Sequence, residues 1–131
     1  MNTQKNSENF KLKIKKQTNA KTRQLEVYSE KVMNIIGLDA AREYLRVDYS
    51  FMDKVIEGLI LGAQTLCQDV AGLSDESWNE IVQSDSDRRK EILRIAVLYT
   101  VGYLFEHLGK ADYHELNLTL QSLLFTIREK D

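Results

Sequence analysis

The sequence predicts an all-α fold, a compact helical bundle of four main helices plus one or two short ones. Three observations support this prediction. The 131 residues include no proline and only six glycines, so strong helix breakers are few. Hydrophobic residues make up 43% of the chain, which is enough for the single core of one domain. Over much of the chain, apolar side chains recur at the spacing of three and four that is typical of amphipathic helices.

The central element is predicted over 86–108, with the sequence SDRRKEILRIAVLYTVGYLFEHL. Its middle is apolar on every side, which is typical of a helix enclosed by other helices or by lipid. Arg94, Glu106 and His107 interrupt the apolar run, which is shorter than the ~20 residues needed to cross a bilayer. We therefore expect a buried helix in a soluble bundle and no membrane span.

The other helices are predicted from apolar spacing and from glycines that suit helix ends. They cover 20–36, 39–45, 50–71, 74–82 and 112–127. The candidate N-terminal caps are Asp39, Ser50, Ser74 and Asp112, and the pairs Ser50–Asp53 and Asp112–Glu115 resemble capping boxes. A three-residue connection predicts that the last two helices form an antiparallel hairpin.

The predicted core combines the apolar faces of these helices. Its members are Tyr28, Val32, Ile56, Leu59, Ile60, Ala63, Leu66, Trp78, Ile92, Ile95, Leu98, Tyr99, Leu104, Leu120 and Leu124. Gly58 and Gly62 lie four residues apart in one helix, where each glycine costs ~1 kcal/mol relative to alanine. Two explanations stay open, namely tight packing inside the bundle and a helix-crossing contact between two copies of the chain.

Charge divides the chain into a basic start and an acidic remainder. Residues 1–24 carry seven basic and one acidic residue, or +6, while the rest carries −8 and the whole chain −2. We predict a flexible basic tail over 1–19 and a single domain over 20–131. The tail either contacts a protein partner, a nucleic acid or an anionic surface, or it only keeps the protein soluble. For the first alternative, the candidate binding residues are Phe10, Lys11, Lys13, Lys15 and Lys16.

Tyr99, Tyr103 and His107 are spaced by four, so they lie along one face of the central helix. Their polar groups either satisfy one another inside the core or line a small-molecule pocket. For such a pocket, Trp78 and Met52 are further candidate lining residues.

His107 and His114 are the only histidines, and acidic residues surround them. Imidazole and carboxylate groups in such a mixture are ligands for zinc or iron. The alternative explanation is structural, because a helix end accounts for His107 and a helix cap accounts for the neighbouring acids. A metal-dependent enzyme centred on the two histidines is therefore the last of three functional hypotheses, and no cofactor is expected.

The first hypothesis is a non-enzymatic regulatory or adaptor protein that binds another macromolecule, most simply a protein. The sequence offers no recognisable catalytic constellation, and the apolar residues on two flanks of the last helix predict a homodimer. The second hypothesis is a helical small-molecule sensor that uses the Tyr99, Tyr103 and His107 face. Cys67 is the only cysteine, so no internal disulfide forms and we expect a cytoplasmic location.

Overall fold

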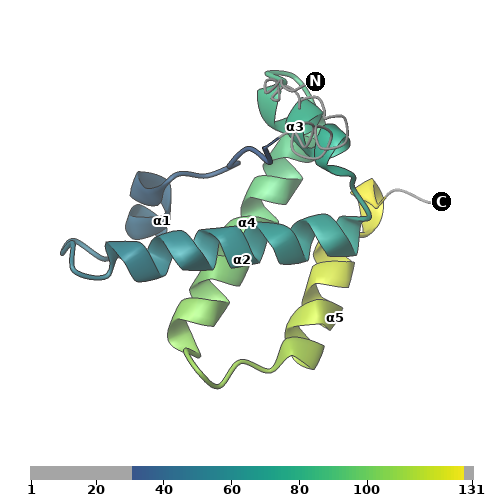
Figure 1. Cartoon of the computed structure of the whole chain (residues 1–131). Helices are drawn as coiled ribbons and strands as arrows, with labels where there is room; N and C mark the ends of the chain where they lie inside the picture. Colours follow the sequence, from purple (N-terminus) through teal and green to yellow (C-terminus); the bar gives the residue numbers. More distant parts are fainter. Residues whose placement is uncertain (1–30, 129–131) are drawn as a thin grey trace, which may run out of the picture. The chain divides into compact units, whose positions relative to one another are not determined.

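The structure is a computed structural model in which residues 31–128 are described, and these residues are all-α (Figure 1). The chain divides into two units, residues 1–32 and residues 33–131. Within the second unit the helices are α1 (Leu38–Leu45), α2 (Asp53–Ala71), α3 (Asp75–Gln83), α4 (Arg88–Glu106), α5 (Tyr113–Leu123) and a 3-10 turn, η1 (Phe125–Ile127). The described residues contain no strand, which confirms the predicted fold class.

The two longest helices, α2 and α4, are each 19 residues long and pack on one another. In Figure 1, α2 lies across both α4 and α5, and α5 runs back beside α4. Helix α1 contacts α2 and α4, while α3 contacts α4. The connection between α4 and α5 covers residues 107–112 and is longer than predicted. Within the part of the chain that is described, no helix is both long and apolar enough to span a membrane.

The core lies where α2, α3, α4 and α5 face one another. Its largest fully buried side chains are Trp78, Ile56, Ile81, Leu93, Leu116, Leu120, Leu124, Val97 and Val101. Of the predicted core, Ile56, Ile60, Ala63, Trp78, Leu104, Leu120 and Leu124 are buried. Residues Val32, Leu59, Leu66, Ile92 and Leu98 are half-buried, and Tyr28 lies outside the described residues.

Two predicted core residues of α4 are instead exposed. The side chains of Ile95 and Tyr99 are 51% and 36% exposed. The prediction was wrong because it assumed that a helix apolar on every side is enclosed on every side. In the structure, the described residues leave one face of α4 uncovered, and this face belongs to the candidate site described below.

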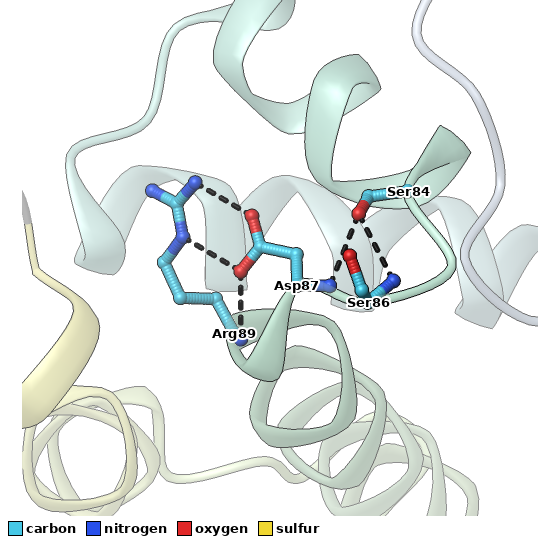
Figure 2. Close-up of polar contacts among 4 residues, drawn as sticks. All are labelled: Ser84, Ser86, Asp87 and Arg89. Atoms are coloured by element: carbon cyan, nitrogen blue, oxygen red, sulfur yellow. Dashed lines mark hydrogen bonds and ion pairs between the residues drawn. The ribbon is translucent and has the colours of Figure 1, made fainter.

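Two helix starts follow the predicted caps, at Ser74 and Asp112, and Asp87 provides a third cap. The side chains of Ser74, Asp87 and Asp112 accept hydrogen bonds from first-turn backbone N–H groups of α3, α4 and α5. Figure 2 shows the junction between α3 and α4, where the Ser84 hydroxyl accepts hydrogen bonds from the N–H groups of Ser86 and Asp87. Such bonds satisfy donors that a helix end leaves free.

Two other predicted caps are wrong. Helix α1 begins after Gly37 and α2 begins after Met52, and neither start has a side-chain cap. Asp39 lies inside the first turn of α1. The carboxylate of Asp53 is instead used in an ion pair with Arg42, at 3.1 Å, which joins α1 to the start of α2.

The end of the predicted helix over 20–36 is also corrected, because residues 31–36 are not helical. Residues 33–36 form a segment, here called the clamped segment, whose backbone is held by buried side chains. The N–H of Met33 donates to Asn79 at 2.8 Å, and the N–H of Ile35 donates to Gln64 at 2.7 Å. The indole of Trp78 donates to the carbonyl of Met33 at 2.8 Å. These bonds replace the helical ones that the apolar spacing predicted.

Candidate functional site: an aromatic groove between α1 and α4

A groove with a volume of about 470 Å³ lies between the end of α1 and the second half of α4. We call it the aromatic groove. It is lined by Tyr44, Leu45, Arg46, Tyr99, Gly102, Tyr103, Phe105 and Glu106. The lining therefore combines four aromatic side chains with one guanidinium and one carboxylate. Ile95, which is exposed, lies one helical turn before Tyr99 and continues the apolar surface along α4.

Gly102 shapes the floor of the aromatic groove. A Cβ atom at this position would lie 2.9 Å from Cε2 of Tyr44. That distance is shorter than an ordinary van der Waals contact, which is 3.5–4.0 Å between carbons. The glycine thus allows the ring of Tyr44 to lie directly against the backbone of α4. This close approach explains why a glycine, which has a low helix propensity, lies in the middle of the long helix α4.

Arg46 follows the last residue of α1 with φ 60° and ψ 43°, in the left-handed region. The Arg46 N–H donates to the carbonyl of Glu43, and the Val47 N–H donates to that of Arg42. These two bonds form a Schellman motif, which usually has glycine at the left-handed position. Among residues other than glycine in the described chain, only Arg46 has a positive φ. A left-handed arginine costs about 1–2 kcal/mol, and this residue lines the aromatic groove.

Tyr103 joins the aromatic groove to the start of α5. Its hydroxyl accepts a hydrogen bond from the N–H of Asp112 at 2.9 Å. Asp112 uses its own carboxylate to cap Glu115, at 3.1 Å. The predicted capping box is therefore present in its first half only. In place of the Glu115 side chain, the tyrosine hydroxyl satisfies the backbone N–H of Asp112.

His107 stacks on Tyr103, with a centroid distance of 4.2 Å and an interplanar angle of 20°. Its Nδ1 lies 2.8 Å from the carbonyl oxygen of Tyr103. Because a carbonyl oxygen only accepts, Nδ1 carries the hydrogen and donates. His107 thus lies at the C-terminal end of α4 and donates to one of the last carbonyl groups of that helix.

The structure brings together only part of the predicted ligand site. Tyr99 and Tyr103 line the aromatic groove, whereas His107 lines a separate groove of about 300 Å³. The end of α4, the loop that follows it, Leu59 of α2 and Tyr113 of α5 form this second groove. Trp78 is fully buried in α3, and Met52 is the residue before α2. Neither of them lines the aromatic groove.

The two predicted alternatives for the tyrosine face can now be compared. The Tyr103 hydroxyl does find a polar partner, but this partner is the N–H of Asp112 rather than Tyr99, and His107 stacks on the ring of Tyr103. The Tyr99 hydroxyl has no hydrogen-bond partner among the described residues. It is therefore available for a bound molecule.

The hypothesis of a metal site at His107 and His114 gains no support. Within residues 31–128, no group of three or more His, Cys, Asp or Glu side chains is placed to hold a metal ion. The candidate binding residues of the tail, Phe10, Lys11, Lys13, Lys15 and Lys16, lie outside the described residues.

Among the described residues, Cys67 and Asp87 have clearly shifted pKa values, and both shifts have structural causes. Burial raises the pKa of the Cys67 thiol to about 11, and its hydrogen bond with Thr100 opposes the shift. The hydroxyl of Thr100 donates to the carbonyl of Ala96 at 2.8 Å, and its oxygen lies 3.7 Å from the sulfur of Cys67. For Asp87, the hydrogen bond from the Arg89 side chain and that from its backbone N–H lower the carboxyl pKa. Neither residue lines the aromatic groove.

Sequence reasoning missed Tyr44, Arg46 and Gly102. The pattern of α1 gives no sign that its end lies against α4, because that contact joins residues far apart in the chain. One signal was present, since a glycine in the interior of an apolar helix indicates a close approach of another group. Gly102 lies three residues after Tyr99 and directly before Tyr103, so it pointed to the face that forms the groove.

Comparisons with known proteins identify no relative. No family model matches the chain, and neither the curated proteins nor the solved structures include a significant match. The functional argument therefore depends on the aromatic groove.

Proposed function

We propose that the protein is a non-enzymatic regulatory or adaptor protein that binds a segment of a partner protein in the aromatic groove. The observation that carries this proposal is the composition of the groove, which combines three tyrosines, a phenylalanine and an arginine. Tyrosine and arginine are among the residue types that contribute most to binding at protein interfaces. The exposed Ile95 extends this surface along α4.

The free charges of the groove indicate what the partner segment contains. Neither Arg46 nor Glu106 makes an ion pair with another described residue. A partner segment with an apolar side chain and a nearby carboxylate would fill the groove and pair with Arg46. An arginine and a carboxylate form two parallel hydrogen bonds, which adds specificity to affinity.

Substitutions in the groove test the proposal. Proteins captured from an extract of the source cells by the tagged full-length chain are compared quantitatively with those captured by Tyr99→Ser and Arg46→Asn. Asparagine tolerates the left-handed conformation, so Arg46→Asn removes the guanidinium without removing the helix end. We expect a specific partner whose affinity falls about 10-fold or more in each variant, as for truncated interface anchors.

Tyr113→Ser is the matched control, because Tyr113 is an exposed tyrosine outside the aromatic groove. The control variant should retain the partner. A set of captured proteins that is the same for all variants would contradict the proposal. Deletion of residues 1–19 tests the basic tail separately. Unchanged partner binding would show that the tail has no part in it.

The volume of the groove supports a second candidate function, a small-molecule sensor. About 470 Å³ lies within the ~300–1,000 Å³ that is typical of small-molecule sites. Native mass spectrometry of gently purified full-length protein distinguishes the two functions. A bound small molecule would add mass that Tyr99→Ser removes and Tyr113→Ser keeps. Protein without added mass, together with a groove-dependent protein partner, would favour the adaptor function.

A further inference from the structure

The solvent side of α2 carries an unusual surface for a helix of this length. Five residues form it, Val55, Gly58, Leu61, Gly62 and Thr65, and we call it the glycine face. Spacings of three and four residues place them together along α2, and all five are exposed. In Figure 1, no other helix lies in front of α2. Because all five residues are exposed, the described helices leave the glycine face uncovered.

The two glycines on this face do not serve packing within the bundle. Apart from the neighbouring residues and backbone of α2 itself, no atom of the described residues lies within 4 Å of a Cβ placed at Gly58 or Gly62. Of the two explanations for this pair, tight packing inside the bundle is therefore not what the described part of the chain shows. Each glycine still lowers the stability of the helix by ~1 kcal/mol relative to alanine, and nothing inside the described unit offsets that cost.

Apolar side chains lie beside the glycines. Leu61 is 59% exposed and Val55 is 40% exposed. The surface thus offers both a protruding leucine and a flat strip without side chains. A protrusion and a hollow on the same face are what a self-complementary two-fold contact requires.

The charges beside the glycine face favour binding of a second copy of this chain, with its α2 helix antiparallel to the first. Lys54 and Asp69 bracket the glycine face, 15 residues or about 22 Å apart along the helix. Neither side chain makes an ion pair or hydrogen bond with another described residue. In an antiparallel pair of α2 helices, Lys54 of each copy faces Asp69 of the other. A parallel pair would place like charges opposite one another.

We propose that the protein forms a two-fold symmetric homodimer through antiparallel α2 helices. Pairing Lys54 with Asp69 places the two-fold axis between Leu61 and Gly62. The same register sets Leu61 of one copy against Gly62 of the other and Gly58 against Thr65. The absence of side chains at the glycines lets the two backbones approach closely. This proposal does not depend on the aromatic groove, which lies between α1 and α4.

One helix pair buries less than the ~1,200 Å² at which standard stable interfaces begin. We therefore expect a dimer with a dissociation constant in the micromolar range. Sedimentation of the full-length chain from about 1 to 500 µM should show a monomer–dimer equilibrium. A chain that stays monomeric over this range would overturn the proposal.

Gly62→Gln tests the close approach. The side chain enters open space in the monomer, and glutamine forms helices better than glycine does, so the fold is retained. Dimerisation should weaken at least about 10-fold, because the added side chain separates the helices. Gln121→Leu, an exposed position on α5, is the control and should leave the equilibrium unchanged. An unaffected Gly62→Gln dimer would overturn the proposed interface.

A charge-reversal pair tests the direction of the helices. Lys54→Asp and Asp69→Lys should each weaken dimerisation about 10-fold, since the symmetry replaces two attractive pairs with two repulsive ones. The double variant restores both attractive pairs and should return to within about three-fold of the original affinity. A double variant that is weaker than either single variant would overturn the antiparallel arrangement.

Discussion

At the scale of single residues, the junction between α3 and α4 depends on Asp87. Its carboxylate accepts hydrogen bonds from the backbone N–H of Arg89, at 2.9 Å, and from the Arg89 side chain. Figure 2 shows both interactions. One side chain therefore caps α4 and also pairs with a cation in its first turn. Both interactions are stronger with the ionised carboxylate than with the neutral carboxyl, which is why the pKa is lowered.

The resulting pH dependence has a definite sign. A carboxyl whose pKa is lower in the folded state adds stability that is fully present above its ordinary pKa of 3.8. That stability is lost as the pH falls through the lower pKa of the folded state. Asp87→Asn keeps a cap acceptor but does not titrate, so the free energy of unfolding should fall less between about pH 7 and pH 3.

Urea denaturation at the two pH values measures this difference. Asp85→Asn is the control, because Asp85 is exposed and has no hydrogen bond or ion pair with a described residue. Between the two pH values, the free energy of unfolding of that variant should fall as much as that of the unsubstituted protein. An equal loss of stability in the Asp87→Asn variant and in the unsubstituted protein would contradict the assignment.

At the scale of elements, the clamped segment shows how far-apart residues override a local pattern. The apolar spacing up to Ile36 favours a helix, yet Gln64, Trp78 and Asn79 satisfy the backbone of residues 33–35 instead. These partners lie 29 to 46 residues away in the chain. Both Gln64 and Asn79 are buried, and unpaired buried amides are costly. The polar side chains and the segment therefore stabilise one another.

Gln64→Ala should destabilise the fold. It leaves the buried N–H of Ile35 without its acceptor, a loss of about 1–3 kcal/mol. Amide hydrogen exchange gives a local measurement, because the Ile35 N–H should lose its protection while the middle of α4 keeps it. Gln121→Ala, on the exposed side of α5, should change stability by less than about 0.5 kcal/mol. Unchanged exchange at Ile35 would show that Gln64 does not hold the segment.

The contact between α1 and α4 leads to a second prediction at this scale. In Gly102→Ala, the new methyl group displaces the ring of Tyr44, which is half-exposed and has space to move. The gain in helix propensity is about 1 kcal/mol, so we expect the melting temperature to stay the same or rise. Partner binding in the aromatic groove should nevertheless fall, because Tyr44 lines it.

Gly62→Ala provides the comparison for this prediction. It brings the same gain in propensity at an open position of α2 and should leave partner binding intact. If Gly102→Ala binds the partner as well as the unsubstituted protein does, Tyr44 has no part in recognition. Circular dichroism and titration calorimetry measure the two effects separately.

At the scale of the whole molecule, the sequence predicted those features that depend on neighbours in the chain. The all-α class, the positions of α2 and α4, and the caps at Ser74 and Asp112 all follow from local spacing and side-chain chemistry. The face that carries Tyr99 and Tyr103 was also predicted. Each of these features is set within one or two helical turns, where the period of the helix governs the outcome.

The rest of the site depends on which helix covers which face. The apolar residues of α4 could not show that Ile95 and Tyr99 remain uncovered, because coverage is decided by the lengths and directions of other helices. For the same reason, the place of Tyr44 and Arg46 beside α4 was not predictable from α1 alone. A left-handed arginine in particular has no sequence signature, since glycine is the usual residue there.

The hydroxyl of Tyr103 has a consequence for the molecule as a whole. The same side chain lines the aromatic groove and holds the N–H of Asp112 where α5 begins. A molecule that binds the groove and favours one position of this ring must therefore also favour or oppose the docking of α5. By thermodynamic reciprocity, any change that loosens α5 then alters the affinity of the groove by the same factor. This hydrogen bond thus couples binding in the aromatic groove to the position of the first turn of α5.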